Sequence, residues 1–137
     1  MANSFLKAAK KVLKTEADAL EKLKDDLPND FSDVVEFILN LTGRVIVSGV
    51  GKSGHIGNKI AATLASTGTP AYFVHATEAS HGDLGMITEQ DLCLLISNSG
   101  ETGEMLDILT HARRFSIPIA TISSNYESTL VKAANFQ

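Results

Sequence analysis

The sequence has little of what marks secreted, membrane or nucleic-acid-binding proteins. Its 137 residues include one cysteine, so they can form neither an internal disulfide nor a cysteine-based zinc knuckle. No apolar run is long enough to span a bilayer, and the N-terminus lacks the continuous apolar core of a signal peptide. Acidic residues outnumber basic ones by 16 to 12, which argues against nucleic acid or an anionic membrane as the main partner. A cytoplasmic location is therefore the default expectation.

The composition is that of an ordinary globular domain. Hydrophobic residues make up 44% of the chain and charged residues 20%, and the length is enough for one domain with a substantial core. The single cysteine, Cys93, lies within an apolar run at residues 92–96, which favours a small buried side chain over a redox or nucleophilic group. No set of His, Cys and acidic residues has the spacing of a structural metal site. We expect no metal and no cofactor.

Two amphipathic helices are expected within residues 1–43. Apolar residues recur at helical spacing over residues 5–27, and Pro28 follows that segment. Asp30 can cap a second helix over residues 31–39, which ends before Gly43. We expect these N-terminal helices to pack on the rest of the domain or to form an oligomer interface.

From residue 44 onward, short apolar runs alternate with helical patterns. The runs that predict strands lie at residues 44–48, 71–74, 92–96 and 117–122, with a fifth beginning at 135–137. The helical patterns lie near residues 56–64, 105–115 and 127–134, and residues 75–87 form an irregular segment. Such alternation is typical of an α/β domain with a parallel sheet and right-handed crossovers.

The most informative segment is Ser97-Asn98-Ser99-Gly100-Glu101-Thr102, which we name the 97–102 turn. It follows one expected strand and opens a helix, so free backbone N–H groups and the positive end of the helix dipole meet there. Three hydroxyl groups add donors, and the glycine permits close approach of a ligand. We interpret this turn as a phosphate cradle. Helix capping is the simpler alternative, although a cap needs only one such residue.

A second glycine-rich segment, the 49–54 turn, follows the first expected strand of the domain. Its Gly49, Gly51 and Gly54 fit the dinucleotide fingerprint, but no acid ends the next strand to hold a ribose, and the spacing is not that of a Walker loop. A nucleotide-dependent oxidoreductase is therefore only a weak alternative. Lys52 and Ser53 of this turn can contact a ligand. Because ligands bind beyond the carboxyl ends of parallel strands, both turns and residues 75–87 can converge on one crevice.

Three ionisable side chains in these segments are catalytic candidates. Glu101 can complement the helix dipole or act as the base that removes a carbon-bound proton. Lys52 can be a solvated loop residue or a cation that steadies a phosphate or an enediolate oxygen. His81 can satisfy loop backbone groups or serve as acid or base in opening a sugar ring. His55 and His75 are weaker candidates for the same task.

Four segments together carry a family resemblance, namely residues 49–57, 65–70, 81–86 and 97–101. They resemble the sugar isomerase (SIS) domain, and within it the arabinose-5-phosphate isomerases. The resemblance implies a three-layer α/β sandwich with a mainly five-stranded parallel sheet and N-terminal helices, divided here into residues 1–43 and 44–137. It also implies an enzyme that interconverts D-ribulose 5-phosphate and D-arabinose 5-phosphate through an enediol, for synthesis of the lipopolysaccharide sugar Kdo.

The resemblance also assigns residues to the expected site. Lys52, His81 and Glu101 match catalytic positions of the family, and Ser97, Ser99 and Thr102 match its phosphate-binding turn. The remaining substrate-binding positions are expected at Gly49, Gly51, Ser53, Asn98 and Gly100. A non-catalytic phosphosugar-binding regulator is the alternative, because SIS domains also occur in regulators.

The resemblance departs from the family at the end of the sequence. Family members continue with a second active-site glutamate, a histidine and C-terminal helices, and full-length relatives usually add a pair of CBS domains. None of these segments is matched, so the chain is expected to be truncated and to lack part of the active site. Relatives assemble as dimers or tetramers with sites built across subunits, so a homo-oligomer is expected, with a sugar phosphate as ligand.

Overall fold

The computed structural model describes residues 2–137 and contains one parallel β-sheet of four strands. In spatial order these are β2 (Ala71–His75), β1 (Val45–Gly49), β3 (Leu92–Ile96) and β4 (Ile119–Ile122). The register places Gly49 beside both His75 and Ile96, and Ile96 beside Ile122. The carboxyl ends of all four strands are therefore aligned. We call this side of the sheet the carboxyl edge, and the opposite side the amino edge.

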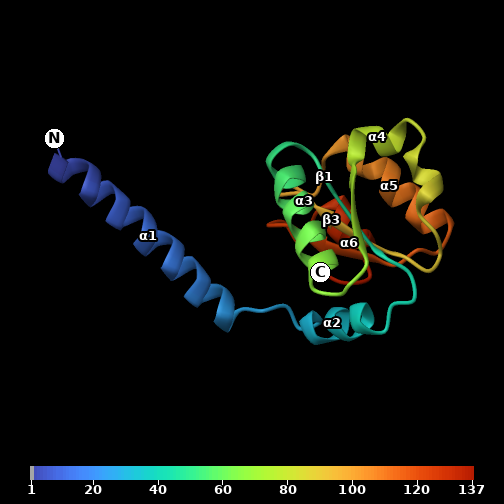
Figure 1. The fold of residues 1–137 in the computed structure, drawn as a ribbon, viewed down its shortest axis with the longest axis horizontal. Coiled ribbons are helices and arrows are strands. Elements are labelled where there is room, and N and C mark those ends of the chain that lie inside the picture. The colour runs from blue at the N-terminus through green and yellow to red at the C-terminus, as the bar shows by residue number, and fades with distance from the viewer. Residues whose placement is uncertain (1) are drawn as a thin grey trace.

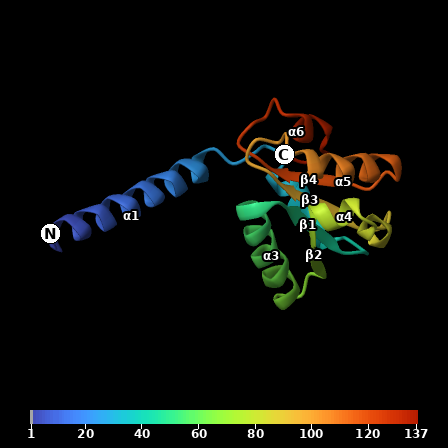
Figure 2. The ribbon, with the colours of Figure 1, turned by 90° about the horizontal axis from the view of Figure 1, so that it is seen from above.

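Helices cover both faces of this sheet (Figures 1 and 2). On one face, α3 (Gly51–Ser66) and α2 (Phe31–Leu39) pack on a core that includes Val45, Val47 and Ile96. On the other, α4 (Ala76–Ser80), α5 (Gly103–Arg114) and α6 (Thr129–Ala133) cover a larger core that includes Ile46 and Leu95. This arrangement confirms the predicted α/β fold with a parallel sheet flanked by helices.

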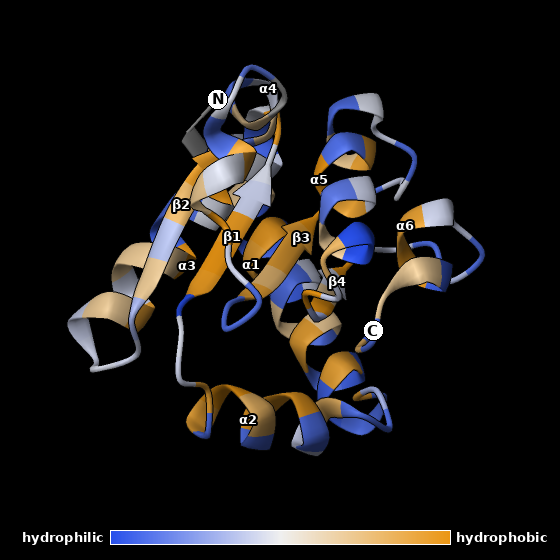
Figure 3. Cartoon of the chain, turned by 90° about the vertical axis from the view of Figure 1, so that its right-hand side faces the viewer, coloured by the Kyte–Doolittle hydropathy of each residue, from blue (hydrophilic) through white to orange (hydrophobic). Residues whose placement is uncertain are grey.

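The two central strands, β1 and β3, are continuous apolar runs because both of their faces are covered. Every residue of β1 is buried, and so is all of β3 except the half-buried Leu94. Figure 3 shows these strands in the hydrophobic colours. Buried Ser48 in β1 is satisfied because its hydroxyl donates to the Val74 carbonyl at 2.6 Å. Cys93 in β3 is fully buried, as predicted, and this burial raises the pKa of its thiol to about 12.

Two sequence-based expectations differ from the structure. Residues 75–87 are not irregular: they contain α4 and a short 3₁₀ helix, η1 (Asp83–Met86). The His75 side chain caps α4 by accepting the Thr77 N–H at 3.3 Å, and the helix buries Ala76 and Ala79. The sheet has four strands rather than five, because Phe136 forms only a single parallel bridge, to Ala120.

The two N-terminal helices behave differently. The Ile38 side chain of α2 packs on the sheet core, and the Phe37 ring lies 5.4 Å from that of Phe136. By contrast, α1 (Ala2–Asp25) projects away from the sheet and its helices (Figure 1). No helix within residues 2–137 combines the length and the apolar character needed to cross a lipid bilayer.

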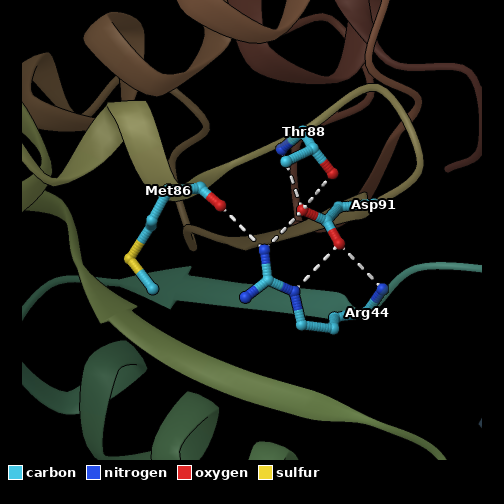
Figure 4. A network of polar contacts seen from close by, with 4 residues as sticks. All are labelled: Arg44, Met86, Thr88 and Asp91. Carbon is cyan, nitrogen blue, oxygen red and sulfur yellow. Dashed lines mark hydrogen bonds and ion pairs between the residues drawn. The ribbon is translucent and has the colours of Figure 1, made fainter.

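A network of charged hydrogen bonds ties the amino edge together (Figure 4). Asp91, next to β3, is 1% exposed and accepts the backbone N–H of Arg44, next to β1, at 2.8 Å. The Arg44 guanidinium lies 3.0 Å from the same carboxylate and also donates to the Met86 carbonyl at 2.7 Å. Thr88 completes the network, because its N–H and hydroxyl donate to Asp91 at 2.8 and 3.0 Å. We call these four residues the amino-edge network.

Candidate functional site at the carboxyl edge

The order of the strands reverses between β1 and β3. From β1 the chain passes through α3 to β2 on one side, and from β3 it passes through α5 to β4 on the other. The segments that leave β1 and β3 therefore diverge, which makes this the switch point where ligands of open α/β sheets bind. These two segments are the 49–54 turn and the 97–102 turn. The structure thus brings the two predicted turns to neighbouring positions on one edge of the sheet.

Both turns lead directly into a helix whose first N–H groups point toward the carboxyl edge. The N-cap residues of these helices, Val50 for α3 and Thr102 for α5, make no side-chain capping hydrogen bond. Within the part of the chain that the structure describes, the N–H groups of Thr102 and Gly103 donate to no protein acceptor. Two helix N-termini with free donors favour an anion at this edge.

The 97–102 turn is held in shape by its own hydroxyl groups. Buried Ser97 places its Oγ 2.9 Å from Thr102 Oγ1 and accepts the Gly100 N–H at 3.1 Å. The Ser99 hydroxyl accepts the Glu101 N–H at 3.2 Å and is exposed. The hydroxyl oxygens are thus used as acceptors, so the Ser99 proton remains available to a ligand oxygen. The alternative of simple capping does not account for this arrangement, because none of these hydroxyls caps α5.

Gly100 is required by the geometry of the turn. Its φ is +69°, a left-handed conformation that favours glycine. A Cβ at this position would lie 2.0 Å from the buried Ser128 Oγ. Close packing of the turn on Ser128 therefore excludes any larger residue.

The segment after β4, residues 123–128, supports the 97–102 turn and was not predicted from the sequence. The Ser124 hydroxyl donates to the Asn98 carbonyl at 2.8 Å, and the Asn125 amide donates to the Ser99 carbonyl at 3.4 Å. Ser128 caps α6 by accepting the Val131 N–H at 3.4 Å. The sequence does carry one indication of this segment: Ser123, Ser124 and Asn125 are polar residues that follow the carboxyl end of a strand, as the 97–102 turn does.

Glu101 is held against the start of α6. Its Oε1 accepts the Thr129 backbone N–H at 2.7 Å, and that hydrogen bond holds the pKa of Glu101 below its ordinary value. The carboxylate is exposed and therefore ionised at neutral pH. It is also a weaker proton acceptor than an unbound glutamate.

The other catalytic candidates are placed by different elements. Lys52 is exposed in the first turn of α3, beside the switch point. His81 is exposed at the end of α4, the helix that follows β2. Within residues 2–137, no hydrogen bond or ion pair joins Lys52, His81 and Glu101. The structure therefore places Lys52 and Glu101 on adjoining turns and His81 on a third segment that starts from the same edge.

The remaining predicted binding residues lie in the same two turns. Gly49 ends β1, Gly51 is exposed with a φ of +57°, and Ser53 is half-buried in α3. Asn98 is exposed, and its carbonyl carries the contacts to residues 123–124. No group of three or more His, Cys, Asp and Glu side chains in the described part of the chain could hold a metal ion.

Known proteins resemble this chain over nearly its whole length. A protein of Yersinia pestis named arabinose 5-phosphate isomerase KdsD is 55% identical over 96% of the chain, and one of the same name from Pseudomonas aeruginosa is 49% identical over 95%. The chain spans only 40% of the length of each. An Escherichia coli CFT073 protein solved in complex with arabinose 5-phosphate is 38% identical, with a TM-score of 0.92 over 98% of this chain and 71% of that one.

The family comparison agrees with these individual matches. The family model described as SIS domain matches residues 38–137, which include the strands and both turns of the switch point. The resemblance predicted from four short segments is thereby confirmed. The chain belongs to the SIS domain family.

Proposed function

We propose that this chain is the sugar-phosphate-binding part of an aldose–ketose isomerase that interconverts D-ribulose 5-phosphate and D-arabinose 5-phosphate. The observation that carries the proposal is the hydroxyl-rich 97–102 turn, which adjoins a second helix N-terminus at the switch point. The names of the relatives from Yersinia pestis and Pseudomonas aeruginosa support the same reaction, and the ligand of the Escherichia coli complex supports a sugar phosphate.

The phosphate is the part of the substrate that this chain is best equipped to hold. Its oxygens accept hydrogen bonds from the Ser99 hydroxyl and from the free N–H groups at the start of α5. Ser97 and Thr102 fix the shape of the turn through their 2.9 Å contact, and one of their two hydroxyl protons is free to reach the ligand. Lys52 supplies a positive charge from the neighbouring turn.

The reaction moves a proton between the first two carbons of the sugar. A base removes the proton from C2 of the open-chain aldose, an enediol forms, and a proton is returned to C1 to give the ketose. We assign the removal of the carbon-bound proton to Glu101, which is ionised and lies within the phosphate-binding turn. Lys52 stabilises the enediolate oxygen, and His81 assists ring opening. The reverse direction, through the same enediol, forms arabinose 5-phosphate, which supplies a cytoplasmic route to Kdo and lipopolysaccharide.

The isomerase is tested by a matched pair of glutamate substitutions in the full-length protein. D-Ribulose 5-phosphate is added and D-arabinose 5-phosphate is followed by NMR. Glu101→Gln should lower kcat by about 100-fold or more with a modest change in KM. Glu104→Gln, an exposed glutamate in the first turn of α5, should leave both constants unchanged.

Two results would contradict the assignment. No exchange in the full-length protein at high concentration would exclude the isomerase. If arabinose 5-phosphate still raised the melting temperature, the regulatory alternative would replace it, because a bound ligand stabilises by mass action. Equal rates for Glu101→Gln and the unmodified protein would remove Glu101 from the mechanism.

A further inference from the structure

Three consecutive carbonyl oxygens of the 97–102 turn are held by residues 123–130, which follow β4 and which we call the clamp segment. The Asn98 carbonyl accepts the Ser124 N–H at 3.3 Å and the Ser124 hydroxyl at 2.8 Å. The next two carbonyls along the turn accept the Asn125 side-chain amide at 3.4 Å and the Leu130 N–H at 3.1 Å. These three oxygens therefore face the clamp segment.

The same contacts set the direction of an N–H group of the turn. The Asn98–Ser99 peptide bond is trans, so its N–H points away from its carbonyl and hence away from the clamp segment. Within the described chain, the Ser99 N–H donates to no protein acceptor. A free N–H on an exposed residue, pointing away from the segment packed behind the turn, is suited to an oxygen of a bound anion.

The clamp segment also holds the carboxylate of the turn. Glu101 Oε1 accepts the Thr129 N–H at 2.7 Å. This hydrogen bond is the main reason that the pKa of Glu101 is lowered, and the positive charge of Lys132, which pairs with Glu127 at 2.8 Å, lowers it further. An acid that was free to move within a phosphate-binding turn would repel the ligand. The contact with Thr129 therefore fixes where that negative charge lies.

We propose that the clamp segment orients the 97–102 turn for a phosphate group. Ser124 holds the Asn98–Ser99 peptide group so that the Ser99 N–H donates to a phosphate oxygen, and Thr129 keeps the Glu101 carboxylate apart from the phosphate. Ser124 and Thr129 are thus positioning residues, because they act through the turn and not on the substrate. The inference rests on the proposed function, since it concerns the phosphate assigned to this turn.

Ser124 is tested by the loss of its hydroxyl. Calorimetry measures the dissociation constant of the full-length protein for inorganic phosphate. Ser124→Ala should raise that constant by roughly tenfold, because the peptide group can then turn its carbonyl toward the anion. Ser124→Thr keeps the hydroxyl and should restore the affinity to within about twofold. Ser66→Ala removes an exposed hydroxyl that donates to the Thr63 carbonyl at 2.9 Å, and it should leave the constant unchanged.

Thr129 is tested by removing its N–H while keeping α6. Proline has no N–H and suits the first residue of a helix, and Ser128 has a φ of −69° and a ψ of 156°, the extended conformation that a residue before proline adopts. Thr129→Pro should therefore fold, free Glu101 and raise the dissociation constant for phosphate by about fivefold at low salt. The increase should shrink at about 0.5 M salt, which screens the repulsion. Thr129→Ser keeps both donors and should bind phosphate as the unmodified protein does.

Two further measurements separate positioning from a general loss of structure. With D-arabinose 5-phosphate, Ser124→Ala should raise KM with less than about twofold change in kcat, whereas a loss of folded protein would lower kcat. In NMR spectra of protein labelled at serine, the Ser99 amide signal should move when inorganic phosphate is added, and should move less in Ser124→Ala.

Equal dissociation constants for Ser124→Ala and Ser66→Ala, or a Ser99 amide that does not respond to bound phosphate, would overturn the proposal. Failure of the isomerase looks different. A protein that binds phosphate through Ser99 but converts no sugar phosphate would contradict the proposed reaction and leave the role of the clamp segment intact.

Discussion

The two edges of the sheet use polar groups in opposite ways. At the amino edge, Asp91 is buried and both of its oxygens are occupied by Arg44 and Thr88. At the carboxyl edge, the polar groups of the 97–102 turn are partly exposed, and several N–H donors have no acceptor in the described chain. The difference shows that one edge is satisfied internally, whereas the other leaves donors free, as the proposed phosphate site requires.

The same contrast appears in Asp91 and Glu101, one carboxylate at each edge whose pKa is lowered. Burial alone would raise the pKa of Asp91, but hydrogen bonds from Arg44 and Thr88 outweigh it. For Glu101, the Thr129 N–H is the main cause, and the side chain is exposed. Substitutions at the two edges should therefore separate stability from ligand binding.

The largest effect is expected at the amino edge. Asp91→Ala leaves Arg44 and the Thr88 donors without their acceptor, which should lower the free energy of unfolding by about 3 kcal/mol. Urea denaturation measures this loss. Glu89→Ala, an exposed acid two residues away, should cost less than about 0.5 kcal/mol. Equal losses for the two variants would show that the amino-edge network contributes nothing specific.

Gly100→Ala should affect both stability and binding. The added Cβ meets Ser128 and the residue keeps a positive φ, so the free energy of unfolding should fall by roughly 2 kcal/mol. The distorted turn should also lose affinity for D-arabinose 5-phosphate, measured by calorimetry. Gly103→Ala has open space around its Cβ and should cost no stability. A variant at position 100 with unchanged stability would refute the tight packing of the turn on Ser128.

Much of the sheet could be predicted because its strands are continuous apolar runs. Each strand predicted within residues 44–122 is present, with ends shifted by two residues or fewer. The helix α4 could not be predicted in this way, since it is five residues long and is defined by the His75 cap and the burial of two alanines. Periodicity also cannot show where an apolar face is buried: α1 has the pattern of a packed helix, yet its leucines are exposed.

Sequence patterns predict only those parts of the candidate site whose residues are close together in the chain. The 97–102 turn was identified because its hydroxyls are neighbours in the chain and follow an obvious strand. The contact between Glu101 and Thr129 joins residues 28 positions apart, and Ser128 packs against Gly100 through the fold. Neither contact leaves a local signal. The catalytic roles of Lys52, His81 and Glu101 stay predictions until kinetic measurements test them.

Ser99→Ala tests the carboxyl edge, where we expect a loss of ligand affinity with little loss of stability. Its hydroxyl is exposed and supports only the local Glu101 N–H, so the free energy of unfolding should change by less than about 1 kcal/mol. The affinity for D-arabinose 5-phosphate should fall by roughly tenfold, since one hydrogen bond to a charged oxygen is lost. Ser66→Ala, on an exposed helix end, is the control for both measurements. Unchanged affinity would remove Ser99 from the phosphate cradle.

The smallest difference between the two edges is expected in how the free energy of unfolding changes at acidic pH. Because the folded pKa of Asp91 lies below its unfolded value of about 3.9, its stabilising contribution is present above that pH and is lost as the pH falls toward the folded pKa. Asp91→Asn should therefore lose stability less steeply than the unmodified chain between about pH 5 and pH 3. Glu101→Gln has the same sign but should flatten the profile less, since an exposed carboxylate is screened by solvent. Urea midpoints across this range measure both slopes, and a larger effect of Glu101→Gln would reverse the roles assigned to the two edges.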